Sequence, residues 1–287
     1  MSVALDSKPD EPSCRLQATP TLSTPRSAVY LTYDIHNPPP HPGAAWTRFV
    51  CISDTHSKIF PVPPGDVLLH AGDLSSRGTL RHLRHAVEWL QSLPHPIKIM
   101  VAGNHDLCLD EHWVVGGKLY QCSGNGIPAE DIAAARAMVH SDTLRQAGLH
   151  YLEHESIRIT VPNGRTWEIY GSPAARRYSL GAFQYKAGVG TAIYSRIPST
   201  TEILITHSPP YGVCDLTRRG QNAGCQELAA RLESRHLCTC RLHVFGHIHE
   251  AHGVALGMPT AQNPCGRLSV NAALHHVGQA VIVDLLN

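Results

Sequence analysis

Aromatic residues are scarce in this sequence, and its net charge is close to zero. Phe, Trp and Tyr make up 6% of the 287 residues, and 24 Lys and Arg residues stand against 23 Asp and Glu residues. Single-stranded nucleic acid is commonly bound by stacking its bases on aromatic rings, and duplexes by a concentrated basic face that displaces counterions. Since the composition favours neither, we expect no strong binding of nucleic acid.

The sequence also lacks the signals of export, membrane insertion and a disulfide framework. No run approaches the roughly 20 apolar residues that a membrane helix needs. Residues 1–12 have no apolar segment of the kind found in signal peptides. The nine cysteines are odd in number and scattered along the chain. We therefore expect a cytoplasmic protein with free thiols and no membrane partner.

Proline, serine and threonine dominate the N-terminal region. Residues 1–27 show little periodicity and predict a flexible tail, whereas residues 28–35 alternate weakly and could form an edge strand. The proline-rich stretch at 37–43 forbids regular structure and predicts a linker. We accordingly expect a flexible segment over residues 1–45 and one folded domain over residues 46–287.

Beyond residue 46 the pattern is that of an α/β fold. Short apolar runs predict buried strands at 49–53, 66–71, 97–102, 157–161, 166–170, 202–206, 242–245, 268–271 and 280–285. Apolar residues at spacings of three and four predict an amphipathic helix from Leu80 to Leu93, and further helices are expected at 130–139 and 223–236. Residues 116–126 are rich in glycine and predict a loop. Strands that alternate with helices indicate a mostly parallel sheet.

Five polar motifs follow five of the predicted strands. They are Asp54-Thr55-His56, Gly72-Asp73, Gly103-Asn104-His105-Asp106, His207 and Gly246-His247-Ile248-His249. In an open α/β sheet, ligands bind in the crevice at the carboxyl ends of the strands. Each motif alone is weak evidence, because a polar turn often carries such residues. Because all five motifs follow predicted strands, we expect their side chains to converge at the carboxyl ends of those strands.

The residue types in these motifs suit a pair of divalent metal ions. Imidazole nitrogens and carboxylate or amide oxygens are ligands for borderline and hard cations, and no cysteine lies among them. In a D-x-H or G-H-x-H triplet on an extended segment, the two polar side chains share one face. The other histidines, including His70 and His275, have core, helix-face or loop explanations and are not predicted as ligands.

The motifs resemble the pattern of the calcineurin-like metallophosphoesterase superfamily over most of residues 48–250. Flanking residues 48–56, 170–173 and 245–250 are similar to the metallophosphoesterase-domain-containing proteins of animal brain and their fungal relatives. The resemblance implies a four-layer α/β/β/α sandwich of two mixed sheets flanked by helices. It also assigns one metal ion to Asp54, His56 and His249, a second ion to Asn104, His207 and His247, and a bridging role to Asp73.

The resemblance further implies a catalytic mechanism. Two ions about 3.5–4 Å apart would hold a bridging hydroxide for in-line attack on the phosphorus. His105 is the candidate general acid, with a structural role as the alternative, and Asp106 would either orient its imidazole or hold the loop. Arg176 and Arg177 could contact phosphate oxygens or simply lie on the surface. The metals are manganese, iron or zinc, with manganese favoured.

The expected substrate is a small phosphodiester such as a cyclic nucleotide. The sequence leaves open a phosphomonoesterase or a nuclease of the same fold. It also leaves open a metal-binding scaffold with little activity, although every ligand position of the pattern is filled. The oligomeric state and the role of the N-terminal segment stay open as well.

Overall fold

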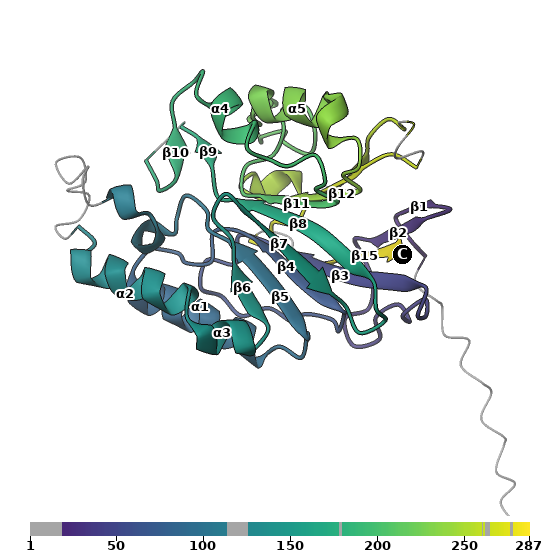
Figure 1. The fold of residues 1–287 in the computed structure, drawn as a ribbon, viewed down its shortest axis with the longest axis horizontal. Coiled ribbons are helices and arrows are strands. Elements are labelled where there is room, and N and C mark those ends of the chain that lie inside the picture. The colour runs from purple at the N-terminus through teal and green to yellow at the C-terminus, as the bar shows by residue number, and fades with distance from the viewer. Residues whose placement is uncertain (1–18, 114–125, 178–179, 260, 262–264, 276–277) are drawn as a thin grey trace, which may run out of the picture.

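Two β-sheets stacked face to face form the centre of the molecule (Figure 1). The computed structural model describes residues 19–113, 126–177, 180–259, 261, 265–275 and 278–287. The strands are β1 (Leu22–Thr24), β2 (Ser27–Tyr30), β3 (Trp46–Ile52), β4 (Val67–Ala71), β5 (Ile97–Val101), β6 (Leu149–Tyr151), β7 (Glu155–Thr160), β8 (Thr166–Ser172), β9 (Ala175–Arg176), β10 (Gln184–Tyr185), β11 (Ile203–Thr206), β12 (Leu242–Phe245), β13 (Gly253–Leu256), β14 (Leu268–Asn271) and β15 (Val281–Leu286). The α-helices are α1 (Leu80–Ser92), α2 (Ala129–Val139), α3 (Asp142–Gln146), α4 (Gly190–Tyr194) and α5 (Gln226–Glu233).

Both large sheets are mixed, with a parallel centre. Within the described residues, the first sheet has the order β1-β2-β15-β3-β4-β5-β6, and the second has the order β13-β14-β12-β11-β8-β7. Strands β3 to β6 run parallel, as do β8, β11, β12 and β14, while β15, β13 and β7 are antiparallel to their neighbours. The carboxyl ends of the parallel strands therefore meet at one end of each sheet.

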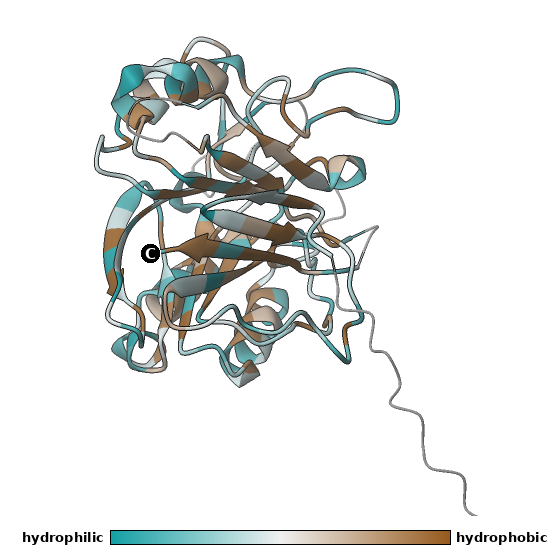
Figure 2. Cartoon of the chain, turned by 90° about the vertical axis from the view of Figure 1, so that its right-hand side faces the viewer, coloured by the Kyte–Doolittle hydropathy of each residue, from teal (hydrophilic) through white to brown (hydrophobic). Residues whose placement is uncertain are grey.

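Side chains alternate between the faces of each strand and so build four layers. In β3, Phe49 and Cys51 pack between the sheets, whereas Val50 and Ile52 pack toward α1 and α2. In β11, Ile203 and Ile205 face the first sheet, and Leu204 packs under α5. Helices α1 to α3 thus cover one sheet and α4 and α5 the other (Figure 1), with apolar strands between them (Figure 2).

The predicted four-layer α/β/β/α sandwich is confirmed. The expected strands coincide with β3, β4, β5, β7, β8, β11, β12, β14 and β15, and the expected helices with α1, α2 and α5. Most of the predicted loop at 116–126 lies outside the described residues. Within the described part of the chain, no helix combines the length and the apolar character needed to cross a bilayer.

The N-terminal region differs from the expectation of a flexible segment up to residue 45. Strand β2 pairs with β15, placing Val29 opposite Val283, and Val29 is fully buried. Strand β1 then forms the outer edge of the sheet by pairing with β2. The folded part therefore begins well before residue 46. Residues 1–18 lie outside the described residues.

Candidate metal centre

The predicted ligands lie where the parallel strands end. Asp54 follows β3 by two residues, Asp73 follows β4 by two, and Asn104 follows β5 by three. His207 directly follows β11, and His247 comes two residues after β12. The first sheet thus contributes the carboxylates and the amide, and the second sheet contributes imidazoles. The site forms between the carboxyl ends of the two sheets, as expected from the strand pattern.

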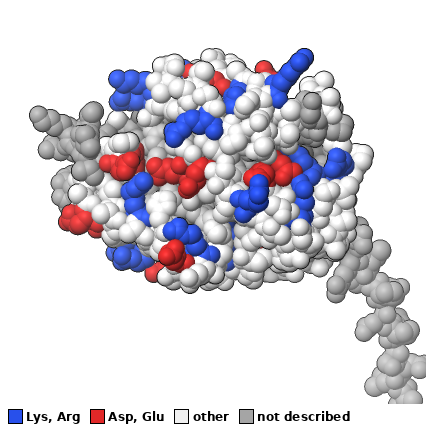
Figure 3. Space-filling model, viewed as in Figure 1, with Lys and Arg blue, Asp and Glu red and all other residues white. Residues whose placement is uncertain are grey.

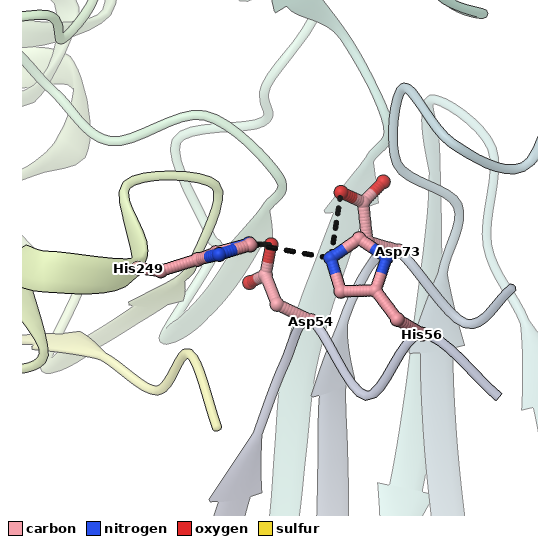
Figure 4. Close-up of side chains that lie close together, drawn as sticks. All are labelled: Asp54, His56, Asp73 and His249. Carbon is pink, nitrogen blue, oxygen red and sulfur yellow. Dashed lines mark hydrogen bonds and ion pairs between the residues drawn. The ribbon is translucent and has the colours of Figure 1, made fainter. Parts of the chain in front are cut away.

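Four side chains form the first cluster, shown in Figure 4. One ligand atom from each of Asp54, His56, Asp73 and His249 lies within 4.8 Å of the others. The Nε2 atom of His249 is 3.1 Å from Asp54 Oδ1 and 3.2 Å from Nε2 of His56. Several lone pairs therefore face one small volume, which is the arrangement that a divalent cation needs.

A second cluster centres on His207. Its Nε2 atom lies 3.0 Å from Asn104 Oδ1 and 3.2 Å from Nδ1 of His247. Its other ring nitrogen, Nδ1, lies 2.9 Å from the carbonyl oxygen of Ala71. A proton on Nδ1 is donated to that carbonyl, so Nε2 stays free to bind a metal. The side chain of His207 is fully buried.

Asp73 lies between the two clusters. Its Oδ2 atom is 3.7 Å from Nε2 of His56, and its Oδ1 atom is 3.4 Å from Nε2 of His207. The backbone N–H of His105 donates a hydrogen bond to Oδ1 at 2.8 Å. Each carboxylate oxygen of Asp73 thus faces a different cluster. Among the predicted ligands within the described residues, Asp73 alone lies between the two clusters in this way.

The backbone at these ligands is left-handed, which is uncommon for residues other than glycine. The φ angles are 55° at Asp54, 47° at His56, 55° at Asp73 and 69° at His247. Such strain concentrates at functional sites. The adjacent glycines allow the loops to approach closely, because a Cβ on Gly246 would lie 2.0 Å from Asp54 Oδ2.

The protonation states of two of the histidine ligands suit metal binding. Burial lowers the pKa of His56 to about 3, against the opposing charge of Asp54. Burial and the neighbouring His207 lower the pKa of His247 to about 3. Both rings are therefore neutral at pH 7, the form that binds a metal. Burial and the charge of Asp54 raise the pKa of Asp73. A cation would relieve the repulsion between these two buried carboxylates.

His105 lies at the edge of the site. Its side chain is exposed, and its ring is perpendicular to that of His56 with a centroid distance of 4.8 Å. The Nδ1 atom is 3.3 Å from the carbonyl oxygen of Ser76. An exposed imidazole beside the ligands can reach a bound substrate, as the proposed general acid requires.

Asp106 is engaged with the backbone. Its carboxylate accepts hydrogen bonds from the N–H groups of Leu74, Ser75 and Gly103 and from the Ser75 hydroxyl, at 2.7–3.1 Å. These bonds join the loop after β4 to the loop after β5. Of the two roles expected for Asp106, the contacts favour holding the loops.

The two arginines are exposed and lie apart from these contacts. Arg176 is the last residue of β9, and its charge acts on Glu227 at the start of α5. Among the described residues, no hydrogen bond or ion pair joins the side chain of Arg176 or Arg177 to a predicted ligand. Contact of these two arginines with phosphate stays a prediction.

One residue at the site was not predicted. The ring of His275 lies 4.9 Å from that of His249 and 5.0 Å from that of His56, measured between centroids. It follows β14, the next parallel strand of the second sheet. The late strand at 268–271 was expected, so the position of His275 after that strand was the signal that could have indicated it.

Imidazole, carboxylate and amide ligands between the carboxyl ends of two stacked sheets define a candidate metal-dependent hydrolase. The sequence profile of the calcineurin-like phosphoesterase family matches residues 34–251. The chain belongs to this family. Its members hydrolyse phosphoesters with divalent metal ions, and the clustered ligands of this chain fit that chemistry.

Individual relatives extend the match over most of the chain. The metallophosphoesterase domain-containing protein 1 of Homo sapiens is 34% identical over 258 residues, which cover 87% of this chain and 74% of that protein. The probable rhamnogalacturonate lyase C of Emericella nidulans is 37% identical over 209 residues, covering 72% of this chain but 17% of that protein. Among solved structures, the protein TT1561 of Thermus thermophilus aligns over 78% of this chain and 88% of its own, with a TM-score of 0.46 and 13% identity.

Proposed function

We propose that the protein is a dinuclear metal-dependent phosphodiesterase that acts on small phosphodiesters such as cyclic nucleotides. The observation that carries the proposal is the position of Asp73, whose two oxygens face two separate ligand groups. Asp54, His56 and His249 would hold one ion, Asn104, His207 and His247 would hold the other, and Asp73 would bridge them. When bound, the two ions activate water and neutralise charge on the phosphoryl group.

The chain's own residues supply positioning and proton transfer. Asp54 accepts hydrogen bonds from the backbone N–H of His247, at 2.9 Å to Oδ2 and 3.1 Å to Oδ1, and thereby ties the second sheet's loop to the first sheet. His105, exposed beside His56, donates a proton to the leaving oxygen. Asp106 holds the loop that carries both His105 and Asn104.

Hydrolysis of model esters tests this proposal. Metal-stripped protein resupplied with manganese, the favoured ion, is assayed on bis-(p-nitrophenyl) phosphate and on p-nitrophenyl phosphate. We expect manganese-dependent hydrolysis of the diester that Asp73→Asn abolishes and that Asp142→Asn, an exposed control, retains. Preference for the monoester would indicate a phosphomonoesterase. Binding of two metals without hydrolysis of either ester would refute the catalytic proposal and favour a scaffold.

A second comparison isolates His105. A general acid matters most for a poor leaving group, so His105→Asn should reduce kcat more for a phenyl diester than for a p-nitrophenyl diester. The loss with the phenyl ester should be on the order of a hundredfold. Equal losses with both esters would show that His105 does not protonate the leaving oxygen.

A further inference from the structure

A basic cavity lies at the end of the molecule opposite the candidate metal centre. It has a volume of about 310 Å³, and Arg26, Arg165, Glu202 and Arg241 contribute charged side chains to its lining. Arg165, Glu202 and Arg241 directly precede β8, β11 and β12, which are parallel neighbours in the second sheet. The cavity therefore opens at the amino ends of these strands, whereas the metal ligands follow their carboxyl ends.

The positive charges in this cavity exceed the negative ones. Within the described part of the chain, Glu202 pairs with Arg165, and neither Arg26 nor Arg241 has a carboxylate within ion-pair distance. Asn287, the last residue of the sequence, also lines the cavity. Counting a terminal carboxylate there, three cations still face two anions. Figure 3 shows basic side chains beside acidic ones toward the right-hand end of the molecule, where β1, β2 and the C-terminus lie in Figure 1.

Two of the three guanidinium groups are held in place. Those of Arg165 and Arg241 lie over the ring of Trp167, at 4.4 and 5.1 Å from its centroid, and Trp167 is fully buried. Arg241 also donates a hydrogen bond to the carbonyl oxygen of Leu286 at 2.6 Å. The Nε atom of Arg165 is buried without a hydrogen-bond partner. These contacts hold the two guanidinium groups in place, and one donor among them has no partner.

The like charges disfavour one another in this position. Burial, followed by the charge of Arg26, lowers the pKa of Arg241 to about 10; Glu202 opposes this shift, and Arg165 adds to it. An anion between the guanidinium groups would reduce this repulsion and accept hydrogen bonds from their N–H groups. Guanidinium groups match the oxygens of phosphate in pairs, which makes arginine a common phosphate ligand.

We infer that the cavity formed by Arg26, Arg165 and Arg241 binds a small phosphate-bearing anion, either inorganic phosphate or the phosphoryl group of a small ester. A volume of about 310 Å³ is at the lower end of the range for small-molecule sites. The inference does not depend on the proposed catalysis, because the lining residues include none of the predicted metal ligands.

Fluorine NMR of the full-length, zinc-loaded protein labelled with 5-fluorotryptophan tests the inference locally. Trp167 reports on this cavity because Arg165 and Arg241 lie over its ring. The fluorine resonance of Trp167 is assigned with a Trp167→Phe variant. Inorganic phosphate and glycerol 3-phosphate are titrated separately at constant ionic strength. We expect at least one of the two compounds to shift the Trp167 resonance in a saturable way. The compound with the lower Kd shows whether the cavity prefers inorganic phosphate or the phosphoryl group of an ester.

Charge-removing variants decide the outcome. Arg26→Gln, which leaves the stacked arginines intact, should weaken phosphate binding on the order of tenfold. Arg81→Gln, an exposed residue on α1, should leave it unchanged. The inference is overturned if neither phosphate compound moves the Trp167 resonance. It is equally overturned if chloride moves that resonance to the same extent or if Arg26→Gln binds as the wild type does.

Discussion

Replacing Asp106 by alanine should lower the thermal stability of the protein, because the main role of this carboxylate is to hold two loops together rather than to assist proton transfer by His105. The carboxylate is buried and accepts hydrogen bonds from three backbone N–H groups, those of Leu74, Ser75 and Gly103. A buried donor left without a partner costs about 1–3 kcal/mol. At the low end of this range, the three amides together cost about 3 kcal/mol. The Ser75 hydroxyl adds little, because it can donate instead to the carbonyl oxygen of His105.

Thermal unfolding followed by circular dichroism measures this cost. At roughly 2–4 °C per kcal/mol for a domain of this size, Asp106→Ala should lower Tm by about 6–12 °C. The control Asp142→Ala removes an exposed carboxylate and should change Tm little. A Tm near that of the wild type, combined with a loss of diester hydrolysis as large as that of His105→Asn, would refute the loop-holding role and favour the orienting one.

Three further predictions concern other positions. Gly246→Ala should weaken manganese binding in calorimetry by about 10- to 100-fold, because its Cβ would lie 2.0 Å from Asp54 Oδ2. Gly126→Ala is the control, since its Cβ would meet no atom of the described residues within 4 Å, and equal affinities of the two variants would contradict the prediction. His275→Ala should lower kcat/KM on the diester about tenfold without loss of bound metal, and unchanged kinetics would exclude a role in positioning substrate. Burial lowers the pKa of His95 from 6.5 to about 4 in the folded protein. Between pH 6.5 and pH 4 the unfolded chain therefore binds a proton at His95 that the folded protein does not bind. The free energy of unfolding consequently falls as pH falls through this window, by at most about 3 kcal/mol. His95→Gln should make the denaturant-measured stability less dependent on pH in that window, and an unchanged pH profile would show that His95 contributes nothing to it.

The sequence predicted the elements whose signal is local. Strands such as β4 and β11 are short, mostly apolar runs with polar motifs directly after them, so the meeting place of these motifs followed from the rule for parallel sheets. For Asp106 the sequence left two roles open, orienting the His105 imidazole or holding the loop. The motif places Asp106 next to His105 but does not show which groups the carboxylate oxygens contact.

Other features depend on contacts between distant residues and left no local pattern. Val29 is buried because β2 pairs with β15, at the other end of the chain, and nothing in a weakly alternating segment identifies that partner. The Arg165 and Arg241 guanidinium groups share the Trp167 ring only once β8 and β12 lie in one sheet. His275 differs from these cases, because it follows a predicted strand and was left out only since no motif accompanies it.

Backbone contacts between separate loops hold the ligands of the candidate metal centre in place. His207 is held through Nδ1 by the carbonyl oxygen of Ala71, the last residue of β4. Asp73 is held by the N–H of His105, and Asp54 by the N–H of His247. Each of these contacts joins a ligand on one loop or strand end to the backbone of another. Because these contacts accompany the left-handed backbone conformations of Asp54, Asp73 and His247, the loops and strand ends together fix the directions in which the ligand atoms face.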